Sequence, residues 1–312
     1  MTGTTTTTPA LGVEGGTDAS TRKFKGGAPE EKSSRAGWGT RIVLAIICAL
    51  WLIPLIGLFI TSFRDEASAG TTGWWTVFTN PGTFGFVGLD NYKAALDTAN
   101  LGNAFINSVA IALPATFVPL LVAAVAAYAF TFMKFPFQDT LFLLVVALLV
   151  IPNYVAFVPI LSIYDHLGIG GSFATVWLFH IGFSMPLAIY IMRNYMATLP
   201  RTVIESAKID GASHFQTFFR LILPMSVPAL ASFAIFQFLW VWNDLFVALV
   251  FIGPGENAPL TVAIKNSLLS QQGAGWNEVT AGGFFSMIVP IIVFLSLQRF
   301  FVRGLTAGAV KG

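Results

Sequence analysis

The residue types that carry most protein chemistry are scarce in this sequence. It has three histidines and one cysteine, Cys48, which are too few for a metal-ligand cluster or an internal disulfide. It has no GxxxxGK[ST] phosphate loop, so any nucleotide chemistry has to come from another chain. What remains is a charged stretch, residues 199–224, and a few polar residues within apolar runs. These features indicate docking and binding rather than bond chemistry.

The composition is that of an integral membrane protein. Of the 312 residues, 55% are hydrophobic and only 10% are charged, and the mean hydropathy is +0.74. Because a soluble domain has about 25% charged residues, a soluble enzyme is excluded. Residues 1–40 are rich in Thr, Gly and Ser and predict a disordered tail, too long and too mixed for a cleavable signal peptide.

Six segments of low charge are long enough to cross a bilayer. A transmembrane helix needs roughly 20 apolar residues, and the gaps between charged residues supply these lengths. We therefore expect an all-α integral membrane domain over residues 41–312, with about six transmembrane helices. The expected spans are 42–63, 105–133, 140–162, 172–196, 225–252 and 279–302. Prolines inside these spans predict kinks rather than helix ends.

The basic residues are strongly biased to one side of these spans. With the N-terminus in the cytoplasm, 14 of the 17 Lys and Arg residues are cytoplasmic, and the outside holds only Arg64, Lys93 and Lys265. The positive-inside rule therefore predicts a multi-pass protein with cytoplasmic N- and C-termini. Residues 199–224, between the fourth and fifth spans, then face the cytoplasm.

Residues 199–224 predict two short helices. Capping boxes mark both starts, in the pairs Thr202–Glu205 and Ser213–Gln216. Gly211 has the residue type that ends a helix, and Pro224 is expected to end the second one. The second helix carries one apolar stripe, made of Phe215, Phe218, Phe219 and Ile222.

Three interpretations fit a polar two-helix element of this kind. It is a structured loop in which Glu205 only caps its own helix, a DNA-binding helix-turn-helix, or a docking site for a cytoplasmic partner. The DNA-binding interpretation fails, because both ends are tied to membrane spans and the basic residues are too few for a phosphate footprint. No nucleic acid is therefore expected as a partner.

The spacing resembles the EAA motif, EAA-x3-G-x9-I-x-LP, of the membrane subunits of binding-protein-dependent ABC importers. Glu205-Ser206-Ala207 is followed at the same spacing by Gly211, Leu221 and Leu223-Pro224, with Ser206 in place of Ala and Leu221 in place of Ile. The segments "AKIDGAS" and "RFFVRGLTAGAVKG" resemble the carbohydrate-uptake branch, in particular the second maltose-type inner-membrane subunit. The resemblance covers nearly all of residues 40–312.

The resemblance implies a permease subunit of an ATP-driven sugar importer in a bacterial cell membrane. The chain would be no enzyme and would bind no cofactor, since ATP and Mg would be held by two partner ATPase subunits. A second, different permease subunit would complete the path, and an extracellular solute-binding protein would deliver the sugar. The ATPase would dock on Glu205, Ser206, Ala207, Asp210, Gly211, Ala212, Leu223 and Pro224. The apolar stripe of the second helix would pack on the cytoplasmic ends of the chain's own helices. The outer loop 253–278 would contact the solute-binding protein through Gln271, Gln272 and Gly273.

Polar residues within the spans are candidates for a translocation path or for bonds between helices. Asp244 is the clearest, with Asn243 beside it and Gln237 seven residues earlier on the same expected helical face. Trp240 and Trp242 would stack on sugar faces. Two interpretations remain for Asp244: a site on the translocation path, or a position at the outer end of a span, where a charge costs little. Hydrogen bonds between helices are favoured for Asn107, Asn153, Gln237 and His180.

Other classes fit part of the sequence. An ABC permease for a non-sugar solute would share the motif. A secondary transporter could use six spans with Asp244 as a proton or cation site, but it needs no cytoplasmic element of this spacing. A membrane scaffold for a cytoplasmic enzyme would explain the docking element but not the polar residues within the spans.

Overall fold

The computed structural model describes residue 3 and residues 37–269 and 275–309, with side chains for all of these except 267, 269 and 299–309. Most of the expected tail, residues 1–40, lies outside the described part. Within the described ranges every regular element is helical, and an isolated antiparallel bridge joins Arg64 to Phe86. This confirms the all-α membrane class, in which each helix satisfies its own backbone hydrogen bonds.

The chain forms two compact units, which divide within α1 (Trp38–Thr61) between Leu50 and Trp51. In the first unit, residues 37–50 are all exposed, although most of them are apolar. An exposed apolar helix of this kind is typical of a surface covered by lipid. The second unit contains the remaining helices and the core.

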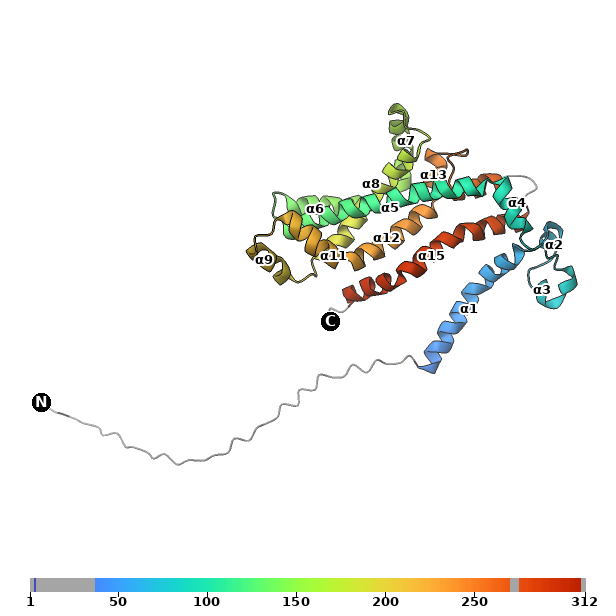
Figure 1. Cartoon of the computed structure of the whole chain (residues 1–312), viewed down its shortest axis with the longest axis horizontal. Helices are drawn as coiled ribbons and strands as arrows, with labels where there is room; N and C mark the ends of the chain where they lie inside the picture. Colours follow the sequence, from blue (N-terminus) through green and yellow to red (C-terminus); the bar gives the residue numbers. More distant parts are fainter. Residues whose placement is uncertain (1–2, 4–36, 270–274, 310–312) are drawn as a thin grey trace. The chain divides into compact units, whose positions relative to one another are not determined.

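Long apolar helices joined by short helical pieces make up the second unit (Figure 1). The long helices are α5 (Leu101–Phe132), α8 (Phe173–Met196), α12 (Val227–Trp242) and α15 (Trp276–Ala309). The shorter ones are α2 (Glu66–Thr71), α3 (Thr76–Thr79), α4 (Asp90–Thr98), α6 (Gln138–Ala147), α7 (Phe157–His166), α9 (Arg201–Ile209), α10 (His214–Thr217), α11 (Leu223–Met225), α13 (Phe246–Phe251) and α14 (Leu260–Ala263). The 3-10 turns are η1 (Pro81–Thr83), η2 (Leu148–Val150) and η3 (Asn153–Ala156), and the π-helical turns are η4 (Phe218–Ile222) and η5 (Ile264–Leu269).

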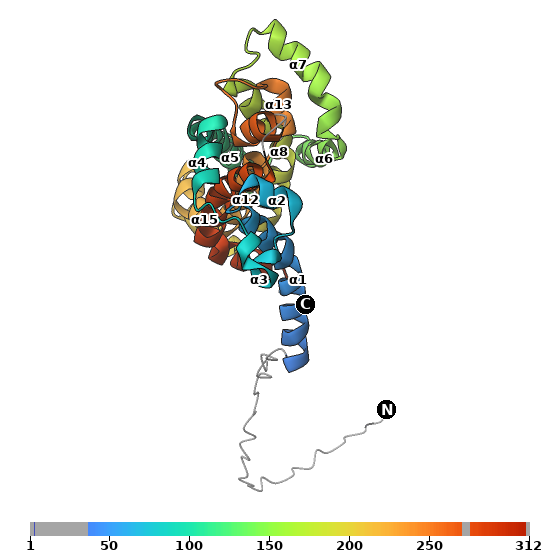
Figure 2. The same cartoon turned by 90° about the vertical axis from the view of Figure 1, so that its right-hand side faces the viewer.

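The core of this unit forms around α5. This helix packs against both α8 and α12, and α12 packs in turn against α15 (Figure 2). Small side chains on α5 let the neighbouring backbones approach closely, and those that are fully buried are Ala112, Ala115, Ala123, Ala124 and Ala127. One core cluster contains Phe179 and Trp242, and a second contains Met192 and Phe218. The second cluster joins the long helices to the element at 199–224.

Four described helices are long and apolar enough to cross a membrane: α1, α5, α8 and the Trp276–Gln298 part of α15. Two helix pairs pass the same test but are bent, Gln138–Val150 with Asn153–His166 by 89° and His214–Met225 with Val227–Trp242 by 70°. The described chain therefore has four spans, or up to six if each bent pair is one span. The expected spans 140–162 and 225–252 overlap these bent pairs.

The first bend is sharper than the kink expected from Pro152, because the helix ends there. Pro152 has no N–H to continue the hydrogen-bond ladder. Its ring also restricts Ile151 to extended backbone, and the observed ψ is 116°. α6 and η2 therefore end before Pro152, and the chain resumes in a new direction through η3 and α7. Pro114 and Pro119, in contrast, lie within a continuous α5.

A buried arginine holds the segment that follows α1. Arg64 is 1% exposed, and its guanidinium donates to the carbonyl oxygens of Ser68, Thr72 and Phe84. The Asn91 side chain of α4 donates to the Arg64 carbonyl at 2.8 Å. Arg64, one of the few basic residues assigned to the outside from the sequence, therefore has a structural role.

Candidate functional site

The two-helix element begins with α9, which ends before Gly211 as expected. Gly211 has a φ of +76°, a left-handed conformation that glycine adopts without strain. Its N–H donates to the Lys208 carbonyl at 3.1 Å, and the Ala212 N–H donates to the Ala207 carbonyl at 2.9 Å. These two bonds form a Schellman motif, which satisfies the last carbonyls of α9 and turns the chain.

Only one of the two expected capping boxes is present. Ser213 caps α10: its hydroxyl accepts from the Gln216 N–H, and the Gln216 side chain accepts from the Ser213 N–H at 2.9 Å. The box at Thr202 and Glu205 is wrong, because α9 already starts at Arg201 and Thr202 lies inside the helix. Glu205 is therefore free of the capping role that competed with docking.

The surface around Gly211 is open. A Cβ at Gly211 would meet no atom within 4 Å, and Glu205, Ser206 and Asp210 are exposed. In the described part of the chain, no salt bridge within 4.0 Å joins Glu205 to a basic side chain. An exposed, unpaired carboxylate can accept a basic side chain from another protein. The other expected docking residues are Pro224, which is exposed, Ala212 and Leu223, which are half-buried, and Ala207, which is buried.

Pro224 does not end the second helix, contrary to the expectation. The helix continues from α10 through η4 and α11, and the bend comes near Ser226. Within η4 the Leu223 N–H reaches back five residues, to the Phe218 carbonyl. A wider turn before a proline relieves the clash between its ring and the preceding carbonyl, so the helix passes through Pro224.

The apolar stripe of the second helix divides into an inner and an outer half. Phe218 and Ile222 are buried, and the Phe218 ring packs against Tyr128 of α5 with centroids 5.3 Å apart. Phe215 and Phe219 are 72% and 46% exposed and contact each other. The prediction that the stripe packs on the chain's own helices is therefore right for the inner pair and wrong for the outer pair.

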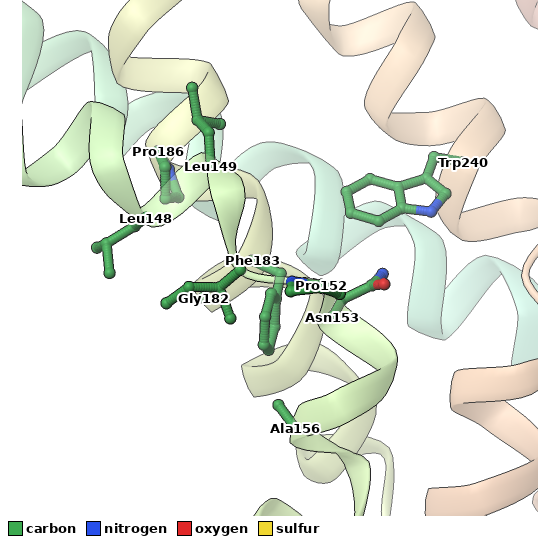
Figure 3. Close-up of a pocket in the computed structure, with 10 residues that line it drawn as sticks. Leu148, Leu149, Pro152, Asn153, Ala156, Gly182, Phe183, Pro186 and Trp240 are labelled. Atoms are coloured by element: carbon green, nitrogen blue, oxygen red, sulfur yellow. The ribbon is translucent and has the colours of Figure 1, made fainter.

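A cavity of about 530 Å³ lies at the break between α6 and α7 (Figure 3). Trp240 of α12 forms one side, and Pro152 and Asn153 lie across from it. Trp240 is 37% exposed, and its ring contacts His180 with centroids 5.6 Å apart. Apolar walls with one indole and one amide suit a polar ligand that has apolar faces. α8 contributes Gly182, Phe183 and Pro186.

The polar residues within the spans have different surroundings. The Gln237 amide donates to the Ala115 carbonyl of α5 at 3.0 Å, which confirms the expected bond between helices. The Asn107 amide instead donates to backbone carbonyls of the loop after α13. His180 is 1% exposed, and its Nδ1 has no hydrogen-bond partner in the described chain. Asn153 differs from these three, because it lines the open cavity.

The three expected path residues lie where α12 ends. Because α12 ends at Trp242, Asp244 does not share a helical face with Gln237. The Asp244 carboxylate accepts the Val247 N–H, in the first turn of α13, at 2.7 Å. Trp242 is 4% exposed, and its indole N–H donates to the Ser286 carbonyl of α15 at 3.1 Å. Asp244 and Trp242 therefore have structural contacts, whereas Asn243 is exposed.

The expected contacts with a solute-binding protein, at Gln271, Gln272 and Gly273, lie outside the described residues.

The α8 residues of the cavity were not among the expected path residues. Gly182 and Pro186, about one turn apart, were a usable signal. A glycine leaves space beside the helix, and a proline leaves a carbonyl without its helical donor.

Known proteins resemble this chain along most of its length. Residues 119–307 match the family described as "Binding-protein-dependent transport system inner membrane component". The osmoprotective compounds uptake permease protein GgtD of Synechocystis sp. is 49% identical over 271 residues, which cover 86% of this chain and 91% of that protein. The alpha-glucoside transport system permease protein AglG of Rhizobium meliloti is 48% identical over 256 residues, covering 80% of this chain and 66% of that protein. The trehalose transport system permease protein SugB of Mycobacterium tuberculosis is 34% identical over 227 residues, covering 72% and 83%.

A solved structure has a similar fold. It is a bacterial alginate ABC transporter in complex with a periplasmic protein that holds an alginate pentasaccharide. One of its chains matches with a TM-score of 0.57 and 14% identity, over 84% of this chain and 94% of that chain. These similarities confirm the resemblance drawn from the EAA-type spacing. The chain belongs to the binding-protein-dependent transport system inner membrane component family and is a permease subunit of an ABC importer.

Proposed function

We propose that this permease subunit imports a carbohydrate across a bacterial cell membrane, driven by ATP that a partner chain hydrolyses. The observation that carries the proposal is the exposed, unpaired Glu205 of α9, six residues before the open Gly211 bend. Relatives named for alpha-glucoside, trehalose and arabinooligosaccharide transport support the class of cargo. The cavity beside Trp240 also supports it, because an indole next to an amide suits a sugar ring with hydroxyl edges.

The element at 199–224 is the proposed contact with the ATPase. Two ATPase subunits would bind ATP and Mg, and one of them would receive this element. Docking has to differ between the resting and the ATP-bound state, because a partner that binds both states equally shifts neither. Glu205 would pair with a basic residue of the ATPase, and the remaining surface would comprise Ser206, Ala207, Asp210, Gly211, Ala212, Leu223 and Pro224.

A second, different permease subunit would complete the translocation path. In this half, the path would pass the cavity between Trp240 and the α6–α7 break. Asn243, Asp244 and Trp242 are proposed to shape its outer end, Asp244 and Trp242 through the packing that they maintain. An extracellular solute-binding protein would deliver the sugar and contact the outer loop at Gln271, Gln272 and Gly273.

The proposed orientation puts the N- and C-termini and the 199–224 element in the cytoplasm. Its support is the placement of 14 of the 17 Lys and Arg residues on that side. The α2–α4 segment and the loop after α13 then face the outside, together with Trp276 at the start of α15.

A single-cysteine experiment tests the docking and the orientation together. Cys48 is the one cysteine of the chain, so Cys48→Ser gives a cysteine-free background. In it, Ser206→Cys places a thiol on the exposed surface of α9, and Thr71→Cys places one on the exposed end of α2 as a control. A membrane-impermeant maleimide is applied to inside-out and right-side-out vesicles, with and without the ATPase.

We expect the position 206 thiol to react only in inside-out vesicles and to be protected by the ATPase. The position 71 thiol should react only in right-side-out vesicles, at the same rate with and without the ATPase. Rapid labelling of position 206 in an importer that holds its ATPase and still transports would contradict the docking assignment. If the position 206 thiol reacted only in right-side-out vesicles and the position 71 thiol only in inside-out vesicles, the orientation would be contradicted.

A further inference from the structure

A second cavity, of about 430 Å³, lies between α9 and the turn that joins α5 to α6. Three basic side chains line it: Lys134 from the turn, and Arg201 and Lys208 from α9. All three are exposed. The remaining lining is mostly apolar or already bonded, since the Gln138 amide donates to the Phe130 carbonyl at 2.7 Å. The cavity therefore combines a concentration of positive charge with an apolar wall.

The positive charges are not neutralised within the described chain. Glu205 is the one carboxylate in the lining, and it lies four residues after Arg201 and three before Lys208 on α9. Neither Arg201 nor Lys208 forms a salt bridge within 4.0 Å with the Glu205 carboxylate. Three cations face one carboxylate, which leaves an excess positive charge for an external anion.

The turn beside this cavity has the character of a membrane interface. Met133 and Phe137, which flank the stretch containing Lys134, are 37% and 78% exposed. Phe137 also has a φ of +61°, which turns the chain into α6. Exposed apolar side chains next to a lysine are typical of the boundary between acyl chains and headgroups, where the apolar part enters lipid and the charge stays in water.

We propose that this cavity binds the phosphate of an anionic phospholipid headgroup from the cytoplasmic leaflet. Arg201 would contact the phosphate through its planar fork of donors, and Lys134 and Lys208 would add compact charges. Met133 and Phe132 would lie along the glycerol and upper acyl region. The inference rests on the proposed orientation, since basic cavities on the cytoplasmic side meet the anionic leaflet. The lipid would join α9, and hence the docking element, to the bilayer surface.

The test uses the complete importer, with its ATPase, in nanodiscs of phosphatidylcholine containing phosphatidylglycerol. Native mass spectrometry measures the retention of phosphatidylglycerol relative to phosphatidylcholine. The double variant Lys134→Gln/Arg201→Gln removes two cavity charges, and Arg41→Gln/Lys93→Gln removes the same charge elsewhere. Each basic residue near an anionic surface contributes about fivefold, so we expect about 25-fold weaker selectivity in the first variant. In the second we expect a loss of at most about fivefold, since Arg41 lies near the cytoplasmic leaflet whereas Lys93 pairs with Asp90 on the other side.

Equal selectivity in the two double variants would overturn the proposal. Displacement of the lipid by millimolar inorganic phosphate would assign the site to the free anion, and binding only after removal of the ATPase would assign the cavity to that partner. Either result rejects the lipid. Co-purification of the ATPase with the Lys134→Gln/Arg201→Gln importer, and its uptake in phosphatidylcholine, are recorded in parallel. If this variant keeps its ATPase and its uptake and its lipid selectivity is unchanged, the lipid site is refuted and the permease function is not.

Discussion

Replacing Gly211 by aspartate separates a docking surface from an ordinary exposed turn, and Gly168 supplies a matched control. Gly211 has a φ of +76° and Gly168 a φ of +69°, both are exposed, and a Cβ at either would meet no atom within 4 Å. Gly168 ends α7 with the same Schellman motif, in which the Ile169 N–H donates to the Tyr164 carbonyl at 3.1 Å. The two sites therefore differ in location but not in local geometry.

The backbone cost of the substitution is the same at both sites. A side chain in the left-handed conformation costs roughly 1–2 kcal/mol, and less for aspartate, which adopts it more readily. Neither variant should therefore unfold. At an interface, however, the new carboxylate would lie near Glu205 and Asp210 and lose its water. Leaving a charge buried and unpaired costs about 3 kcal/mol or more, which weakens docking by over about 100-fold at 1.4 kcal/mol per factor of ten.

The assay is ATP-dependent uptake of labelled sugar by cells, combined with the membrane level of the permease and co-purification of the ATPase. We expect both variants to reach the membrane at the normal level. Gly211→Asp should lose the ATPase and the uptake, and Gly168→Asp should keep both. Normal uptake in Gly211→Asp, or equal losses in the two variants, would refute the docking argument.

Four further substitutions have defined outcomes. Glu205→Gln should change the free energy of unfolding by less than about 0.5 kcal/mol, because the residue is exposed. It should weaken ATPase binding by about tenfold through loss of a charge-assisted bond, which titration of the purified ATPase measures. Trp240→Ala should lower uptake without destabilising the permease, whereas Trp242→Ala removes a buried ring and should cost about 3–5 kcal/mol, visible in thermal denaturation. The hydrogen bond from the Ser68 N–H lowers the pKa of Asp65 below its usual 3.8, so the N-cap of α2 should be intact above pH 3.8 and lost as the pH falls through the lower folded-state pKa. Hydrogen exchange in α2 checks this, and Asp65→Asn should remove the pH dependence.

The features that could be predicted from the sequence are those decided by neighbouring residues. Ser213 caps α10 because a hydroxyl three residues before Gln216 reaches its N–H without help from the rest of the fold. Gly211 ends α9 because the chain takes the left-handed conformation there, which glycine adopts at little cost and most other residues do not. Thr202 fails as a cap for the opposite reason. The helix had already started at Arg201, a boundary that spacing alone does not locate.

The course of the chain at prolines could not be predicted in the same way. Four prolines within apolar runs have three outcomes: Pro114 and Pro119 lie in a continuous helix, Pro152 follows a helix end, and Pro224 is preceded by a π-helical turn. In each case a carbonyl loses its helical donor, and the outcome depends on which tertiary partner or altered turn replaces it. The cavity beside Trp240 exists because the chain breaks at Pro152, so its position could not be predicted either.

α12 connects the proposed docking element to the cavity. It begins just after Ser226, where the second helix of the element bends, and Trp240 lies about 20 Å further along at 1.5 Å per residue. The Gln237 bond to Ala115 of α5 and the Trp242 bond to α15 hold these three helices together. A displacement of the element by an ATPase would therefore move α5, α12 and α15 as one body. The broken segment around Pro152 forms the other side of the cavity and is not joined by these two bonds, so we expect the distance between Trp240 and this segment to change with the state of the ATPase.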